Sequence, residues 1–312
     1  MASYEFRPRP KRRKGDRHDE NEDNVVHQPR PEYKLLRASE LPSWAIDNPF
    51  LRTGYRPISA SMKRCVDSLL HVHNETINIY SHLIPAVIAF AGNYFLHIYF
   101  QKHYPAAPVI DRLAIHIYLT TSLICFAISS IYHTLCCHSQ TYSAFWLRWD
   151  FAGITLQITG SLVSGIYMAF YCQPRLQQLY WTMTIVFGLL STFIVVNPRF
   201  QSPQWKSLRT STFMAMGLSA FLPIVHTVLI YEYDQLYQKT GIGNYLIEGL
   251  VLTLGTVFFT THFPESYIPE RFDIFGASHQ IFHILVVIGA LIHMSSLLSV
   301  YDWVHRNPQC AN

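Results

Sequence analysis

The sequence predicts an all-α membrane protein, a seven-transmembrane helix bundle with a cytosolic N-terminus and an extracellular C-terminus. Three observations lead to this prediction. Of the 312 residues, 50% are hydrophobic and only 14% are charged, whereas an ordinary soluble domain has about 25% charged residues. Apolar runs of about 20 residues, the length that crosses a bilayer, recur along the chain. Basic residues are also more frequent on one side of the predicted membrane.

The N-terminal part carries most of the charge. Met1–Asn74 contains 14 Lys/Arg and 10 Asp/Glu, and the rest of the chain contains 10 of each. We expect residues 1–38 to be a disordered, charged cytosolic tail, because they lack apolar periodicity. Acidic residues directly follow the basic run 11–14, so no nucleic-acid partner is expected. Residues 39–74 mix aromatic and basic residues and predict an amphipathic juxtamembrane segment with its Lys/Arg toward lipid headgroups; packing beneath the bundle is the alternative.

Residues 75–312 are predicted to form the seven-transmembrane domain. Six of its apolar runs are long enough to cross about 30 Å of hydrocarbon, and the run 248–263 is about two residues short. Pro-containing polar loops join the runs and leave no room for an inserted soluble domain. The predicted spans are Asn78–Phe100, Leu113–Leu135, Phe151–Tyr171, Leu179–Val196, Phe213–Tyr231, Glu248–Phe263 and His279–Val300.

Lys and Arg near the ends of the spans predict the orientation. With the N-terminus in the cytosol, the inner side carries more basic residues than the outer side, as the positive-inside rule requires. An odd number of spans then places the C-terminus outside. The inner residues are Arg52, Arg56, Lys63, Arg64, Arg148, Arg199, Lys206, Arg209 and Arg271, and the outer ones are Lys102, Arg112, Arg175, Lys239 and Arg306.

The six cysteines have no spacing typical of a disulfide framework. We therefore expect them to be reduced or buried, with no disulfide scaffold. The N-terminus also lacks the pattern of a secretory signal, so the first span is expected to act as its own signal.

Polar residues at the inner ends of four spans predict a site. Ionisable groups inside a membrane are costly and normally face the bundle interior with a partner. Isolated histidines such as His97, His116, His226 and His293 are expected to be structural. The convergent set is different, because several helices bring it to one depth: Glu75, Asn78, His82, Ser129, His133, Asp150, His279 and His283.

The pair His279 and His283 lies on successive turns of one helix face and predicts a metal site. A third imidazole, from His133, would complete a set of three nitrogen ligands that suits Zn²⁺. Water can fill the fourth position, and Asp150 is either a fourth ligand or the group that holds and deprotonates this water. A competing set of softer ligands is Cys136, Cys137 and His138.

These motifs together resemble the progestin and adipoQ receptor family, which includes the adiponectin receptors, the hemolysin III proteins and yeast zinc-homeostasis proteins. The resemblance covers about residues 40–300, and the stretch Pro269-Glu-Arg-Phe272 is most similar to the fungal branch. The motifs are Glu75-Thr-Ile-Asn78-Ile-Tyr-Ser-His82, Ser129-Ser-Ile-Tyr-His133, Asp150-Phe-Ala-Gly153 and Ser278-His279-Gln280-Ile-Phe-His283.

The resemblance implies zinc near the inner leaflet, bound by His133, His279 and His283, with Asp150 approaching through water and Ser129 as the motif serine. It also implies ceramide or a related lipid amide as candidate substrate, roles in lipid and zinc homeostasis, and an extracellular protein or a sterol as candidate ligand. We expect a zinc-dependent hydrolase in which Asp150 and Ser129 are catalytic. Glu75, Asn78 and His82 are expected to orient the ligands or to cap and brace helices.

Two alternatives remain at this stage. One is a receptor without enzymatic activity in which zinc is structural, and the other is a zinc sensor or transporter. Transport is the less favoured, because the ionisable residues are expected to cluster at one end of the bundle. Plasma membrane and endoplasmic reticulum both remain open as locations.

Overall fold

The computed structural model describes residues 34–307 and Cys310. The predicted tail therefore lies outside the described residues, except for its last five positions. Seven helical segments in the described part are long and apolar enough to span a membrane, which confirms the integral, multi-pass class. The helices are α1 (Met62–Asp67), α2 (Thr76–His103), α3 (Val109–Leu135), α4 (Gln140–Ala169), α5 (Pro174–Val196), α6 (Lys206–Leu218), α7 (Phe221–Ile230), α8 (Tyr233–Thr240), α9 (Ile242–Thr261) and α10 (Ser278–Arg306).

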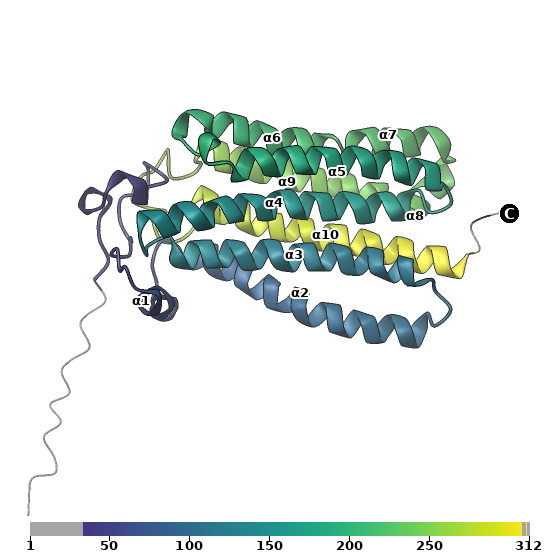
Figure 1. Ribbon diagram of the computed structural model, residues 1–312, viewed down its shortest axis with the longest axis horizontal. Helices are drawn as coiled ribbons and strands as arrows, with labels where there is room; N and C mark the ends of the chain where they lie inside the picture. Colours follow the sequence, from purple (N-terminus) through teal and green to yellow (C-terminus); the bar gives the residue numbers. More distant parts are fainter. Residues whose placement is uncertain (1–33, 308–309, 311–312) are drawn as a thin grey trace, which may run out of the picture. The chain divides into compact units, whose positions relative to one another are not determined.

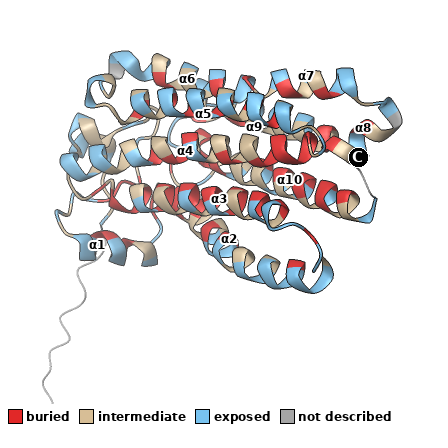
Figure 2. Cartoon of the chain, turned by 45° about the vertical axis from the view of Figure 1, so that its right-hand side comes forward, coloured by how far each residue is buried: buried red, intermediate tan, exposed pale blue. Residues whose placement is uncertain are grey.

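The long helices run side by side, and α3, α4 and α10 lie at the centre of the bundle (Figure 1). α3 packs against both α2 and α4, while α9 packs mainly against α10. Buried residues follow α3, α4 and α10, and α5 to α7 expose much of their outer surface (Figure 2). This pattern is expected of a membrane bundle, because apolar outer faces contact lipid. An apolar core cluster joins α2, α3, α4 and α10 and includes Tyr118, Met168, Leu297 and Tyr301.

One membrane span is built from two helices. α6 and α7 together form the span Lys206–Ile230, with a turn at Ser219 and Ala220 between them. Pro223 explains the break, because it has no N–H to donate to the carbonyl of Ser219 four residues earlier. The carbonyl of Ser219 instead accepts a hydrogen bond from Leu222 N at 3.3 Å.

Two boundaries differ from the predictions and affect the site. The third span starts at Gln140, whereas the apolar pattern placed its start at Phe151. Asp150 therefore lies inside α4, not at its entrance, because the polar and aromatic residues 140–149 also form helix. Ser139 explains the early start: its side chain accepts a hydrogen bond from Tyr142 N and caps the helix. The sixth span is α9, which begins at Ile242 and has 20 residues, enough to cross the membrane.

The described segment before α2 contains the six-residue α1 and three short 3-10 helices, Ala38–Glu40, Ser43–Ala45 and Ser68–Leu70. Arg56 in this segment is only 4% exposed. Its guanidinium donates to His133 O at 2.5 Å and Thr134 O at 3.0 Å. The prediction that this arginine contacts lipid headgroups is wrong: the carbonyls at the end of α3, which have no partner within the helix, bind it instead.

Two cysteines depart from the expectation that the cysteines are reduced or buried. Cys172 and Cys310 form a disulfide with a Cα–Cα distance of 5.4 Å. It joins the turn after α4 to the residues after α10, across a sequence separation of 138. Spacing could not reveal it, because the two cysteines meet only through the fold. The other cysteines, Cys65, Cys125, Cys136 and Cys137, are free.

Candidate metal centre

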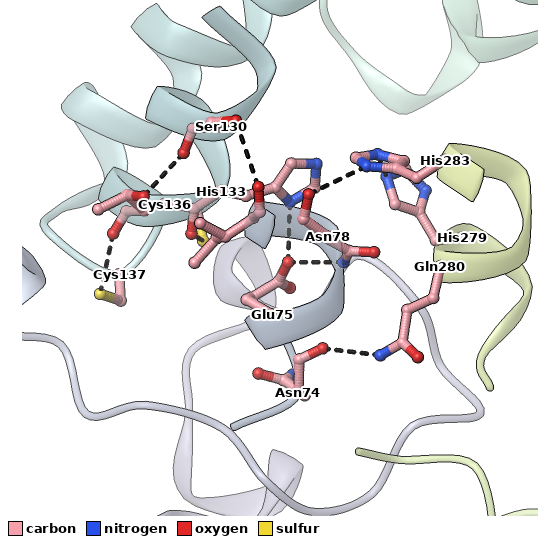
Figure 3. Close-up of polar contacts among 12 residues, drawn as sticks. Asn74, Glu75, Asn78, Ser130, His133, Cys136, Cys137, His279, Gln280 and His283 are labelled. Carbon is pink, nitrogen blue, oxygen red and sulfur yellow. Dashed lines mark hydrogen bonds and ion pairs between the residues drawn. The ribbon is translucent and has the colours of Figure 1, made fainter. Parts of the chain in front are cut away.

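Three histidines from two helices form the centre. His133 lies near the end of α3, and His279 and His283 lie on the first two turns of α10. One side-chain nitrogen of each residue lies within 4.8 Å of the others, and no other group of three or more His, Cys, Asp or Glu in the described part meets this criterion. Figure 3 shows the rings facing one another from the two helices. The predicted pairing of α3 with α10 through these imidazoles is therefore present.

Hydrogen bonds to the second nitrogens orient two of the rings. His133 Nδ1 lies 2.8 Å from Glu75 Oε2, and His283 Nδ1 lies 3.2 Å from Asn78 O. In each case an Nδ1–H can donate to an oxygen, which leaves Nε2 with its lone pair toward the centre. Asn78 also donates from Nδ2 to Glu75 Oε2 at 2.8 Å, so the carboxylate is held in place. Such outer hydrogen bonds are typical of metal-binding histidines.

The distances between the nitrogens fit a tetrahedral metal ion. His279 Nε2 and His283 Nε2 are 3.1 Å apart, and two ligands of a tetrahedral Zn²⁺ are about 3.3 Å apart when each bond is about 2.05 Å. His133 Nε2 is buried and has no hydrogen-bond partner among the described residues. A buried imidazole nitrogen without a partner is costly, and a bound cation would remove this cost. The residues therefore fit a metal ion held by three nitrogen ligands.

The Glu75 carboxylate adds the charge that a cation site needs. It lies at the N-terminus of α2, directly before the membrane span. Burial raises the pKa of Glu75, but the hydrogen bond from His133 and the positive charge of Arg56 outweigh it and lower this pKa below its usual value. The carboxylate is therefore ionised at neutral pH and can stabilise positive charge at the centre.

The other predicted site residues lie around this cluster. His82 is buried, and its ring stacks on that of His283 with centroids 3.9 Å apart. Ser129 and Asp150 are buried next to one another, 2% and 9% exposed, and Asp150 is near His133. Asp150 does not belong to the group of ligand atoms within 4.8 Å. A metal ion held by the three nitrogens would therefore have no fourth side-chain ligand from this group.

The competing ligand set is not assembled. Cys136 Sγ lies 3.2 Å from an Arg56 nitrogen, Cys137 Sγ lies 3.6 Å from Cys65 Sγ, and His138 stacks on Tyr142. The three neighbouring side chains thus point to different partners, because successive residues at the end of a helix face different directions.

Two buried polar residues that support the centre were missed by the sequence analysis. Glu265 accepts a hydrogen bond from Ser278 N at 2.8 Å, at the start of α10. Gln280, between the two histidines of α10, donates to Asn74 O at 3.1 Å and Ile274 O at 2.9 Å. Both fix the first turn of α10, and with it His279 and His283. The position of Gln280 inside the histidine motif was the only signal for either residue.

Contrary to the expectation that ionisable residues cluster at one end of the bundle, others lie far from the three histidines. His293 pairs with Glu248 at 2.8 Å, and His305 pairs with Asp111 at 3.1 Å. His283, His293 and His305 occupy successive levels along α10, spaced by about 15 Å and 18 Å at 1.5 Å per residue. By contrast, His226 has an ordinary structural partner, the hydroxyl of Tyr180 at 2.8 Å.

The fold and the site define a seven-helix integral membrane protein with a buried three-histidine cluster at one end of the bundle. Comparison with known proteins identifies its family. The family model described as Haemolysin-III related matches residues 70–294, and the chain belongs to this family, which comprises the hemolysin III proteins, the adiponectin receptors and the progestin and adipoQ receptors. The matched region includes every residue of the candidate centre.

Relatives come from several kingdoms. The chain is 33% identical to an adiponectin receptor protein of Drosophila melanogaster, over 84% of this chain and 58% of that receptor. It is 32% identical to an ADIPOR-like receptor of Saccharomyces cerevisiae, over 87% of this chain and 86% of the relative. A heptahelical transmembrane protein of Arabidopsis thaliana is 31% identical over 89% of this chain and 90% of the relative. The three identities are nearly equal, so they show the family but do not distinguish its branches. Membership of the fungal branch stays a prediction.

Proposed function

We propose that the protein is a zinc-dependent hydrolase of lipid amides, with ceramide as the candidate substrate. The observation that carries this proposal is the three-nitrogen cluster with no fourth side-chain ligand in its group. Catalytic zinc sites have three protein ligands and an open position, whereas structural sites are closed by four. Bound there, Zn²⁺ would polarise the amide carbonyl and lower the pKa of a water molecule.

The residues of the chain have separate roles in this proposal. Asp150, buried beside the cluster but outside its ligand group, accepts the proton of the attacking water and later donates it to the leaving amine. Ser129, next to Asp150, donates a hydrogen bond that positions the water or the developing oxyanion. Glu75 and the carbonyl of Asn78 hold the rings of His133 and His283.

The surroundings of His279 support a lipid substrate. His279 is only partly buried, unlike His133 and His283. Its ring lies 5.4 Å from that of Phe259 and 6.3 Å from that of Phe282, measured between centroids. An acyl chain can pack against these apolar rings while its amide reaches the histidines, so the substrate would enter from the membrane.

A second candidate function is that of a receptor with a structural zinc. Its support is the names of the relatives, an adiponectin receptor protein and an ADIPOR-like receptor. In this reading the metal ties α3 to α10, and a protein or sterol ligand bound on the outer side changes the packing of the bundle. Roles in lipid and zinc homeostasis are compatible with both candidates.

We further propose that the histidine end of the bundle faces the cytosol. The free thiols Cys65, Cys136 and Cys137 lie at this end, and the disulfide Cys172–Cys310 lies beyond the last turns of α4 and α10, at the other end. Disulfides persist in oxidising compartments and are rare in the cytosol. The basic residues before α2 agree with this orientation, which puts the C-terminus on the extracellular or lumenal side.

The deciding experiment measures hydrolysis and metal content on the same preparation. Purified protein in lipid nanodiscs is given ceramide with a labelled acyl chain, and release of the free fatty acid is followed. We expect release by the wild type and a loss of at least about 100-fold for Asp150→Asn, because this variant removes the proton acceptor but keeps its size. The metal content of Asp150→Asn should stay unchanged. If the wild-type protein is fully loaded with metal but releases no fatty acid, the receptor with a structural zinc is favoured.

A further inference from the structure

A second polar site lies deep in the bundle, about 15 Å along α10 from His283. Its centre is His293, which is 4% exposed. His293 Nδ1 lies 2.8 Å from Glu248 Oε2 on α9, and the ring stacks on Tyr118 of α3 with centroids 4.5 Å apart. Ionisable pairs at this depth are costly, and they usually mark a functional site.

Two polar atoms at this site have no hydrogen-bond partner among the described residues. One is Nε2 of His293, and the other is the hydroxyl of Tyr245, on the first turn of α9. The neighbouring Ser296 hydroxyl uses its only hydrogen for Gly241 O, at 3.2 Å, so it has none to donate to Tyr245. Since Nδ1–H of His293 donates to Glu248, the neutral ring has an acceptor at Nε2. The site thus presents one acceptor and one donor, both shielded from solvent.

Both groups border the same small space, which Gly165 of α4 keeps open. A Cβ added to Gly165 would lie 3.3 Å from Tyr245 Oη and 3.7 Å from Cε1 of His293, the atom bonded to Nε2. A Cβ would thus touch both groups, and because Gly165 has none, no side chain of α4 stands between them at this position. The side chain of Tyr245 is only partly buried, but its hydroxyl is shielded from solvent.

We infer that this space binds a hydroxyl group, which donates to His293 Nε2 and accepts from the hydroxyl of Tyr245. The hydroxyl belongs either to a water molecule or to an alcohol group of a membrane amphiphile. Other ligand chemistries fit less well. The Glu248 carboxylate repels an anion, a carbonyl has no hydrogen for Nε2, and a metal would find only one nitrogen ligand. A hydroxyl supplies both the donor and the acceptor on a single oxygen atom, which an amide does only with two heavy atoms.

A density map at a resolution that shows ordered water tests the inference directly. We expect density within hydrogen-bond distance of both His293 Nε2 and Tyr245 Oη. A compact, isolated peak identifies water, and a peak continuous with a chain leading to the lipid identifies an amphiphile. Absence of density in a map that resolves waters elsewhere in the bundle overturns the inference.

Substitution of Gly165 gives an independent test by thermal unfolding in nanodiscs. Gly165→Ala fills the space with a methyl group, whereas Gly165→Ser brings a hydroxyl to the same two partners. Gly249 of α9 is the matched control, because a Cβ there meets nothing within 4 Å. We expect Tm of Gly165→Ser to exceed that of Gly165→Ala by about 2 °C or more. At Gly249, the Tm of the serine variant should be no higher than that of the alanine variant, since serine has a lower helix propensity.

The result that overturns the inference is a lower Tm for serine than for alanine at both positions. In that case only size and helix propensity matter, and no hydroxyl is recognised. If the Gly165 variants do not fold, the density map of the wild-type protein decides. Neither experiment depends on the proposed hydrolase activity, because both report on His293 and Tyr245 alone.

Discussion

At the level of single residues, Glu75 connects the start of the membrane domain to the metal centre. It accepts hydrogen bonds from both His133 and Asn78, each at 2.8 Å. The acceptor that faces a ligand's second nitrogen fixes the orientation of the ring and increases the basicity of the nitrogen that faces the metal. Glu75 is therefore a positioning residue, and its effect should appear in metal affinity.

Glu75→Gln tests this role. The amide keeps the size of the side chain but loses the negative charge, so the ring of His133 is held less strongly. We expect zinc affinity to fall by about 10- to 100-fold, as measured by competition with a chromophoric chelator. The control is Glu232→Gln, a change at a residue before α8 that has no contact with the centre in the described structure. Equal affinity of Glu75→Gln and wild type would contradict the assigned role.

The ligands were predictable from the sequence, but the residues that support them were not. Histidines four apart on one face are readable from sequence because the helix repeat determines their direction. Arg56 and Gln280 act through backbone atoms of residues far along the chain, Arg56 on His133 O and Gln280 on Asn74 O. No spacing rule links such partners, so these contacts become visible only in the folded chain.

At the level of helices, the pairing of α3 with α4 positions His133 relative to Asp150. Gly160 of α4 allows this close approach. A Cβ there would lie 2.1 Å from Thr121 Oγ1 and 2.8 Å from Thr121 Cγ2 of α3. Small residues let membrane helices approach closely and pack well. This contact therefore sets the distance between the two helices.

Gly160→Ala should lower the stability of the protein by about 1–3 kcal/mol, because the added methyl overpacks the interface. Thermal unfolding in nanodiscs measures the effect. Gly217→Ala is the matched control, since a Cβ at Gly217 meets nothing within 4 Å, and its Tm should not fall. The double variant Gly160→Ala/Thr121→Ala should recover most of the loss. A Tm of Gly160→Ala equal to that of the control would show that the helices are not in close contact.

Helix boundaries show where sequence patterns were insufficient. The seven spans were readable because apolar length is a strong signal. The first eleven residues of α4, Gln140 to Asp150, were not, because polar and aromatic residues mask the helix there. The capping contact of Ser139 with Tyr142 N was the local signal for the true start. It moves Asp150 into the interior of α4, beside the histidines.

At the level of the whole molecule, the two ends of the bundle differ in the state of their cysteines and in their basic residues. The centre and three free thiols are at one end, and the disulfide is at the other. A cytosolic centre would be loaded from the cytosolic metal pool.

Cysteine labelling tests the orientation. Lys63 before α2 and Lys102 at the end of α2 are both exposed, on opposite ends of the first span. A membrane-impermeant maleimide should label Lys63→Cys only after the plasma membrane is permeabilised. It should label Lys102→Cys in intact cells, or, for an internal organelle, only after detergent opens the lumen. Labelling of Lys63→Cys in intact cells would contradict the proposed orientation.

We propose that three imidazoles from α3 and α10 hold one metal ion. Metal analysis of purified protein after gel filtration in metal-free buffer measures this without any assumption about activity. We predict about one zinc per wild-type chain and near-complete loss in His133→Ala, His279→Ala and His283→Ala. The control His226→Ala should keep its zinc, because His226 hydrogen-bonds to Tyr180. Wild-type zinc content in all three ligand variants, provided that they are folded, would contradict the claim.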